Sequence, residues 1–172
     1  LEVYGAGAIE KGLSTVKLAT AGRICVVSDK FVPDKHLINY SHVIEGLHYP
    51  GTATKSCASS IRWFRDTFAG DFADFDGLIK DIPIGSEGLI FHPYLSGELT
   101  PYGNTKLRGS FVGISSVHTK SHFIRAVYEG ITLSLLDCKK YLESKGYKKN
   151  VVILTQPLEY RKHKNKLLPI AK

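Results

Sequence analysis

Residues 107–129 read LRGSFVGISSVHTKSHFIRAVYE and hold the strongest structural signal in the chain. The apolar run from Phe111 to Ile114 is typical of a short strand. Apolar residues then recur every three or four positions, which is the period of one face of an α-helix. We expect this helix to stop near Gly146, with lysines at its C-terminal end where the helix dipole favours cations. Its apolar face consists of Phe123, Val127, Ile131, Leu135, Cys138 and Leu142.

Upstream of this helix, the sequence predicts a hairpin and several short elements. Two β-rich runs, Ser14–Leu18 and Arg23–Val27, flank the turn Ala19-Thr20-Ala21-Gly22 and predict the hairpin. A second apolar stripe predicts a helix, with Ser56 as a reasonable N-cap. This stripe consists of Cys57, Ile61, Phe64 and Phe68. The other expected elements are an extended stretch at 40–47, a short helix at 74–82 and a buried strand at 89–91.

The order of these elements indicates the fold class. Val151–Leu154 is an apolar run typical of a strand buried on both faces. Strands come first, and helices then alternate with strands, which implies an α/β fold with a mixed sheet. A length of 172 residues fits one domain of ordinary size, or one half of a two-domain protein.

Composition excludes several classes of protein. The longest apolar runs have four residues, which is too short for a transmembrane helix. The first five residues lack the basic flank and apolar stretch of a signal peptide. Cys25, Cys57 and Cys138 are scattered and form no CxxC pair, so we expect a reducing, cytoplasmic location and no disulfide framework.

The net charge of +7 is unevenly distributed. From Lys139 onward there are ten Lys or Arg residues and only Glu143 and Glu159 as acids, whereas the first 138 residues are nearly neutral. A basic tail can bind phosphates without sequence specificity. No aromatic platform or reading helix accompanies these lysines, so we expect a solvated surface and no nucleic-acid partner.

Most motifs that carry chemistry are absent or incomplete. Gly5-Ala6-Gly7-Ala8-Ile9-Glu10 begins like a dinucleotide fingerprint, but Glu10 stands where the third glycine belongs and no strand precedes it. The chain has neither a GxxxxGK[ST] phosphate loop nor a GxSxG nucleophile elbow. His118 and His122 lie four positions apart without a third ligand, which favours a surface or capping pair over a metal site.

One pair of local features could serve a phosphate. The hairpin turn brings the Thr20 hydroxyl and the backbone N–H groups up to Gly22 toward one point. On the helix that begins near Ser56, Ala58 and Arg62 lie on one face, where free N–H groups would attract an anion. From these residues alone, a tight turn beside a helix with a solvent-facing arginine is the more common interpretation.

Several spaced motifs together resemble a known family. Tyr94-Leu95-Ser96-Gly97-Glu98-Leu99-Thr100-Pro101 is followed by Leu107-Arg108-Gly109, the strand at 110–114, His122-Phe123 and Ala126-Val127-Tyr128-Glu129. This pattern resembles the C-terminal signature of the FGGY carbohydrate kinases, and within that family it is most similar to the xylulokinases. The resemblance extends from about Tyr4 to Leu154. It includes Gly5–Ala8, the Ala19–Gly22 turn and the segment 61–66.

The resemblance implies two actin-like (ribonuclease H-like) α/β domains with a cleft between them. In such kinases the N-terminal domain binds the sugar and the C-terminal domain binds most of the MgATP. This chain resembles only the C-terminal domain, so residues 1–154 are expected to form an ATP-binding domain and residues 155–172 an unmatched basic tail. The family's general-base aspartate would lie just upstream of Leu1. We therefore expect no catalytic residue and no metal ligand within this chain.

The resemblance implies that ATP and Mg²⁺ bind at the hairpin turn and at the start of the helix that begins near Ser56. We therefore expect the turn and this helix start to face each other. Six residues are the candidates for this nucleotide site: Thr20, Ala21, Gly22, Ala58, Ser59 and Arg62. The resemblance also implies that Glu98 and Arg108 organise the loop between the domains. For Glu129 a helix-surface or capping role is expected.

The chain departs from the family pattern at three places. The phosphate turn is usually Gly-Thr-Ser-Gly, and many relatives have glycine where this chain has Ala58. The family also has a glycine-rich turn for adenine and ribose after a strand like Val151–Leu154, but this chain has no glycine after Gly146. A matched segment followed by an unmatched tail suggests a truncated or frame-shifted gene, or a boundary chosen by cloning.

Three interpretations stay open on the sequence. The first is the ATP-binding domain of a sugar kinase for a pentulose such as xylulose, or for another sugar or polyol such as gluconate, ribulose or glycerol. In that case the chain is a partial polypeptide, inactive alone, whose sugar is bound by the missing N-terminal domain. The second is a non-catalytic remnant without useful ATP affinity that self-associates, for example as a homodimer. The third is a nucleic-acid binder.

Overall fold

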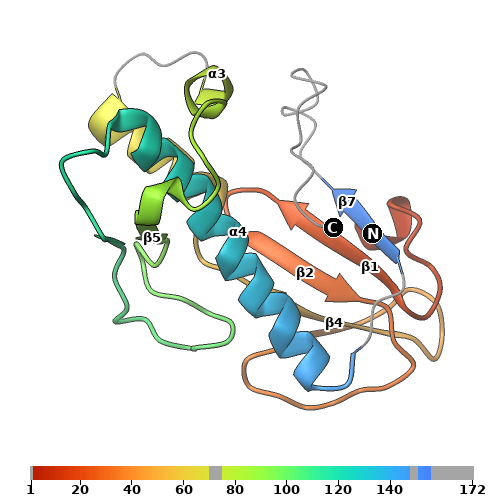
Figure 1. The fold of residues 1–172 in the computed structure, drawn as a ribbon. Coiled ribbons are helices and arrows are strands. Elements are labelled where there is room, and N and C mark those ends of the chain that lie inside the picture. Colours follow the sequence, from red (N-terminus) through yellow and green to blue (C-terminus); the bar gives the residue numbers. More distant parts are fainter. Residues whose placement is uncertain (1, 70–74, 148–150, 156–172) are drawn as a thin grey trace.

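The computed structural model describes residues 2–69, 75–147 and 151–155. The predicted mixed sheet is present and has the strand order β3-β4-β2-β1-β7. All neighbouring pairs are antiparallel except β1 and β7, which run parallel (Figure 1). The strands are β1 (Leu13–Leu18), β2 (Gly22–Val26), β3 (Ile38–Ser41), β4 (His48–Ala53) and β7 (Val151–Thr155).

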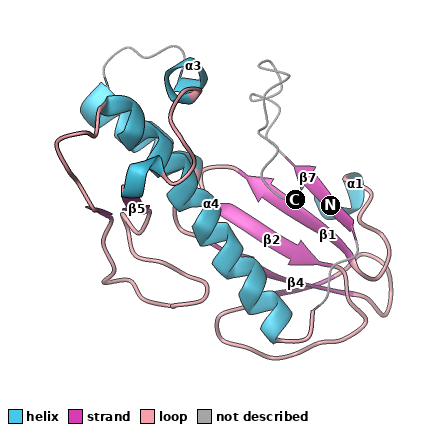
Figure 2. Cartoon of the chain, viewed as in Figure 1, coloured by secondary structure: helices cyan, strands magenta, loops and turns pink. Residues whose placement is uncertain are grey.

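The two faces of this sheet pack against different helices because side chains alternate along each strand. Ile24 and Val26 on β2 pack with Cys138 and Leu142 of α4 (Lys120–Ser144), the long predicted helix. Cys25, which lies between them, and Val27, which follows β2, belong to a second cluster on the opposite face. Val3, from the short helix α1 (Glu2–Gly5), packs against that cluster. Figure 2 shows α4 crossing the sheet.

The predicted apolar stripe of α4 is the buried face of the helix, and Val127, Ile131, Cys138 and Leu142 are all buried. The helix ends at Ser144, and Gly146 follows with a φ of +84°, the left-handed conformation common after a helix end. The contact between α4 and β5 is so close that a Cβ at Gly130 would lie 2.2 Å from the Phe91 carbonyl oxygen.

A smaller layer covers the N-terminal half of α4. Its two-stranded antiparallel sheet pairs Phe91 with Phe111, and both side chains pack into the cluster around Ile124 and Val127. The elements of this layer are α2 (Ala58–Phe64), the π-helical turn η1 (Arg65–Ala69), α3 (Phe75–Ile79), the 3₁₀ turn η2 (Ser86–Gly88), β5 (Ile90–His92) and β6 (Ser110–Val112).

Two predicted strands are wrong in detail. Residues 42–47 form the connection between β3 and β4 and do not form the extended stretch expected at 40–47. The sequence pattern missed β4 because it contains Pro50 and Gly51, which are rare in strands. Gly51 is nevertheless required, since a Cβ there would lie 2.3 Å from the Cys25 sulfur. Val152 is 44% exposed, so the edge strand β7 is not buried on both faces as predicted.

The predicted helices also differ at their ends. Cys57, not Ser56, is the N-cap of α2, and the Ser56 hydroxyl hydrogen-bonds the Ser59 and Ser60 hydroxyls. Phe68 follows α2 on the π-helical turn and is 56% exposed, so the expected stripe ends at Phe64. The helix expected at 74–82 is shorter, and its first residue lies outside the described residues. Within the described segments, no helix combines the length and hydropathy that a bilayer span requires.

Candidate functional site

The hairpin turn and the start of α2 lie directly against each other, as expected. The Thr20 carbonyl oxygen accepts hydrogen bonds from the backbone N–H groups of Cys57 (3.0 Å) and Ser59 (3.3 Å). It also accepts one from the Ser59 hydroxyl at 2.8 Å. The Ala58 N–H donates to the Ala19 carbonyl oxygen at 2.9 Å. We call residues 19–21 together with Ala58, Ser59 and Arg62 the turn–helix cluster.

These contacts correct one expectation about the helix start. The N–H groups of Cys57, Ala58 and Ser59 were expected to be free for an anion, but all three donate to carbonyl oxygens of the turn. The helix is also only seven residues long. The start of α2 therefore positions the turn and does not itself offer donors to a ligand.

The donors available for a ligand lie on the turn itself. No partner among the described residues accepts a hydrogen bond from the N–H groups of Thr20 and Ala21, and both residues are exposed. One guanidinium N–H of Arg62 donates to the Thr20 hydroxyl oxygen at 2.9 Å. The Thr20 hydroxyl can therefore donate its own proton outward, beside a positive charge. This set of donors is chemically suited to phosphate oxygens.

Gly22 has a different role from the other five predicted site residues. It is buried, and a Cβ on it would lie 2.8 Å from a methyl carbon of Leu135 on α4. Its N–H donates to the Thr54 hydroxyl at 3.0 Å, and its carbonyl accepts from the Thr54 N–H at 2.9 Å. Gly22 thus lets the turn pack closely on α4, beneath the turn–helix cluster.

The cluster lies at the edge of the sheet where ligands of α/β proteins commonly bind. Strands β1 and β7 are parallel, with Lys17 paired to Thr155, so their C-terminal ends meet at the same edge. Clefts at the carboxyl ends of parallel strands are the usual ligand sites in such sheets. The tail after Thr155, where the sequence lacks the family's glycine-rich turn, lies outside the described residues.

Glu98 and Arg108 differ in their surroundings although both belong to the loop 93–109 between β5 and β6. Glu98 is only 1% exposed and hydrogen-bonds residues outside its loop. Burial raises the pKa of its carboxyl. Arg108 is exposed, and its guanidinium donates to the carbonyl oxygens of Thr105 and Leu107 in the same loop. Of the two, Glu98 therefore connects the loop to the rest of the domain.

The histidine pair and Glu129 have structural partners. The Nδ1 atom of His122 accepts the Thr119 N–H at 3.0 Å in a capping box at the start of α4. His118 Nδ1 accepts the Ser115 N–H at 2.9 Å. Glu129 accepts the Gly85 N–H at 3.0 Å and the Arg125 guanidinium N–H at 2.7 Å. In the parts of the chain that the structure describes, no three His, Cys, Asp or Glu side chains are grouped to hold a metal ion.

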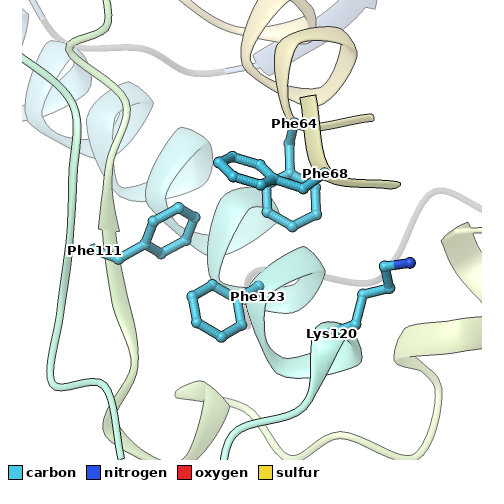
Figure 3. Close-up of a pocket in the computed structure, with 5 residues that line it drawn as sticks. All are labelled: Phe64, Phe68, Phe111, Lys120 and Phe123. Atoms are coloured by element: carbon cyan, nitrogen blue, oxygen red, sulfur yellow. The ribbon is translucent and has the colours of Figure 1, made fainter. Parts of the chain in front are cut away.

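A cavity of about 370 Å³ lies between the end of α2, β6 and the start of α4 (Figure 3). Its walls are mostly aromatic rings, which offer no hydrogen-bond donors to a phosphate. It therefore differs in chemistry from the turn–helix cluster. The sequence pattern did not predict this cavity, because its residues come from four separate elements, α2, η1, β6 and α4. These residues are Phe64, Phe68, Phe111, Lys120 and Phe123.

Comparison with known proteins identifies the family. Residues 33–155 match the model of the C-terminal domain of the FGGY family of carbohydrate kinases. Xylulose kinase from Lactococcus lactis is 37% identical over 149 residues, covering 84% of this chain and 30% of that protein. Gluconokinase from Bacillus subtilis is 35% identical over 148 residues, covering 78% of this chain and 29% of that protein. This chain thus spans about a third of the length of these relatives.

A solved structure agrees with this match. The crystal structure of ligand-bound xylulose kinase from Lactobacillus acidophilus superposes with a TM-score of 0.79 at 30% identity, over 90% of this chain and 32% of that one. The predicted fold class, an α/β domain of the actin-like ATPase type with a mixed sheet flanked by helices, is confirmed. The chain belongs to the FGGY family of carbohydrate kinases and corresponds to its C-terminal domain, and xylulose kinases are among its most similar relatives.

Proposed function

We propose that this chain is the ATP-binding domain of a sugar kinase that phosphorylates a pentulose-type, xylulose-like sugar. The sugar pocket and the general base would belong to an N-terminal domain that precedes Leu1, so the chain alone would be inactive. One observation carries the proposal. The exposed residues Thr20 and Ala21 follow β1 at the edge of the sheet where β1 and β7 end, and the half-buried Arg62 donates to the Thr20 hydroxyl there.

The turn–helix cluster would bind the triphosphate of ATP. The N–H groups of Thr20 and Ala21 and the Thr20 hydroxyl would donate to phosphate oxygens, and Arg62 would add a positive charge beside them. Ser59 and Ala58 would hold the turn in place through the bonds to Thr20 and Ala19. Bound MgATP would supply the transferable phosphoryl group, and Mg²⁺ would come with the phosphate oxygens that are its usual ligands.

The choice of sugar rests on the relatives. Xylulose kinases are among the most similar proteins, which favours a ketopentose as acceptor. Gluconokinase from Bacillus subtilis is nearly as similar, which makes gluconate the second candidate. A protein that joins this domain to its own sugar-binding domain should be assayed with D-xylulose, D-ribulose, gluconate and glycerol. The proposal requires the highest kcat/KM for D-xylulose, and a preference for gluconate would replace it.

The nucleotide part of the proposal can be tested on the chain itself by thermal unfolding. A ligand at a hundred times its Kd stabilises a protein by about 2.7 kcal/mol, and this raises the Tm of a domain of this size by about 5–10 °C. We expect that shift with MgATP but not with MgCl₂ plus adenosine, which has no phosphates. If millimolar MgATP leaves the Tm unchanged, the chain is instead a remnant without useful ATP affinity.

A further inference from the structure

The least exposed acidic side chain in the described residues lies outside the turn–helix cluster. Glu98, in the loop 93–109, is 1% exposed. Its Oε1 atom accepts two short hydrogen bonds, from the Lys55 N–H and the Leu99 N–H, both at 2.7 Å. Its Oε2 atom accepts the Ser134 hydroxyl of α4 at 3.4 Å. A single carboxylate thus joins the loop, the end of β4 and α4.

The loop continues this contact along β4. The Thr100 N–H donates to the Ala53 carbonyl oxygen at 3.1 Å, and the Thr100 hydroxyl accepts the Ala53 N–H at 3.4 Å. The Lys55 ammonium donates to the Ser96 carbonyl oxygen at 3.2 Å. Residues 96–100 therefore dock on the end of β4, and the Glu98 and Thr100 side chains accept N–H groups that a neighbouring strand would otherwise bind.

The same short segment after β4 also holds the hairpin turn. Thr54 makes two hydrogen bonds with Gly22, and Cys57 and Ser59 both donate to the Thr20 carbonyl oxygen. Lys55 lies between these contacts, and its N–H is the group that Glu98 binds. Glu98 therefore binds the same segment, 54–59, that holds the hairpin turn.

We propose that Glu98 is a positioning residue that couples the loop 93–109 to the phosphate-binding turn, so that both are held as one rigid unit. This inference rests on the proposed nucleotide site. This coupling depends on the buried Glu98 oxygen that accepts two N–H groups, more than on the negative charge of the carboxylate. Removing that oxygen leaves both N–H groups without their partner in a partly buried place, and the segment 54–59 would then loosen.

The substitutions E98A and E98Q separate these roles, and E45A, at an exposed glutamate in the 42–47 connection, is the matched control. Glutamine keeps one oxygen for the two N–H groups, and its amide can donate to the Ser134 hydroxyl. The MgATP Kd should rise about ten-fold or more in E98A and stay within three-fold of wild type in E98Q and E45A. All Kd values are measured at least 20 °C below the Tm of each variant.

Hydrogen exchange gives a second readout that needs no nucleotide. In the wild type, the amides of Lys55 and Leu99 should exchange as slowly as those of β4. In E98A the amides of Cys57 and Ser59 should exchange at least ten-fold faster, whereas E98Q should retain wild-type protection.

The possible outcomes are distinct. If wild type does not bind MgATP, the proposed function fails, and hydrogen exchange still decides whether Glu98 couples the loop to the turn. If E98A binds MgATP as tightly as wild type, or if E98Q is as impaired as E98A, the inference is overturned. Should E98A not fold, E98D takes its place. Its shorter side chain should lose one amide bond and raise the Kd at least three-fold, and an unchanged Kd would overturn the inference.

Discussion

Replacing Thr20 by alanine is the sharpest single perturbation of the turn–helix cluster. The Thr20 hydroxyl accepts a guanidinium N–H of Arg62 at 2.9 Å, which leaves its own proton to donate to a phosphate oxygen. A hydrogen bond to a charged group contributes about 1.5–3 kcal/mol. The MgATP Kd of T20A should therefore rise roughly 10- to 150-fold. The side chain is exposed, so the free energy of unfolding should change by only about 0.5 kcal/mol.

Titration calorimetry of MgATP into each variant measures this effect. T20S keeps the hydroxyl and should bind MgATP within about three-fold of wild type. T105A removes a threonine hydroxyl from an exposed position of the loop 93–109 and serves as the matched control. A Kd of T20A within two-fold of wild type would refute a contact between this hydroxyl and a phosphate. Equal losses in T20A and T105A would show that the effect is not specific to the turn.

Three further predictions concern stability. G130A places a Cβ against the Phe91 carbonyl and should lower the free energy of unfolding, measured in urea, by about 2–3 kcal/mol. The control L133A, at an exposed position of α4, should change this free energy little. Lys145 lowers the pKa of the Asp34 carboxyl to about 2. The stability that this ion pair contributes is therefore present above pH 4 and is lost as the pH falls toward 2, and the free energy of unfolding of D34N should fall less over that range. Burial raises the pKa of the Cys138 thiol to about 12, so iodoacetamide at pH 8 should label this thiol only as fast as the protein unfolds. Labelling that is complete as soon as the reagent is added would contradict the burial of Cys138.

The parts of the fold that depend on local sequence could be predicted. The stripe from Phe123 to Leu142 places α4 correctly, because a long helix with one buried face shows its period in the sequence. The hairpin was predicted from two β-rich runs around the turn 19–22. Strand β4 was missed because Pro50 and Gly51 are tolerated only through contacts with β2 and β3, which local patterns do not contain.

The contact between the hairpin turn and the start of α2 could be predicted, but its hydrogen bonding could not. Thr20, Ala58 and Arg62 were brought together as expected, yet the sequence could not show that the N–H groups at the start of α2 donate to the turn. That pairing joins residues about 40 positions apart. The burial of Glu98 likewise depends on β4 and α4 and gives no local signal.

Both the proposed function and the role of Glu98 require that the exposed turn at Thr20 and Ala21 binds the phosphates of ATP. The most direct measurement is an amide chemical-shift titration of the ¹⁵N-labelled chain with MgATP. We predict that the Thr20 and Ala21 amides shift most, and that the amides of residues 57–59, which are already hydrogen-bonded to the turn, shift less. Shifts confined to the aromatic cavity around Phe111 and Phe123, or no shifts at millimolar MgATP, would show that the turn does not bind the phosphates.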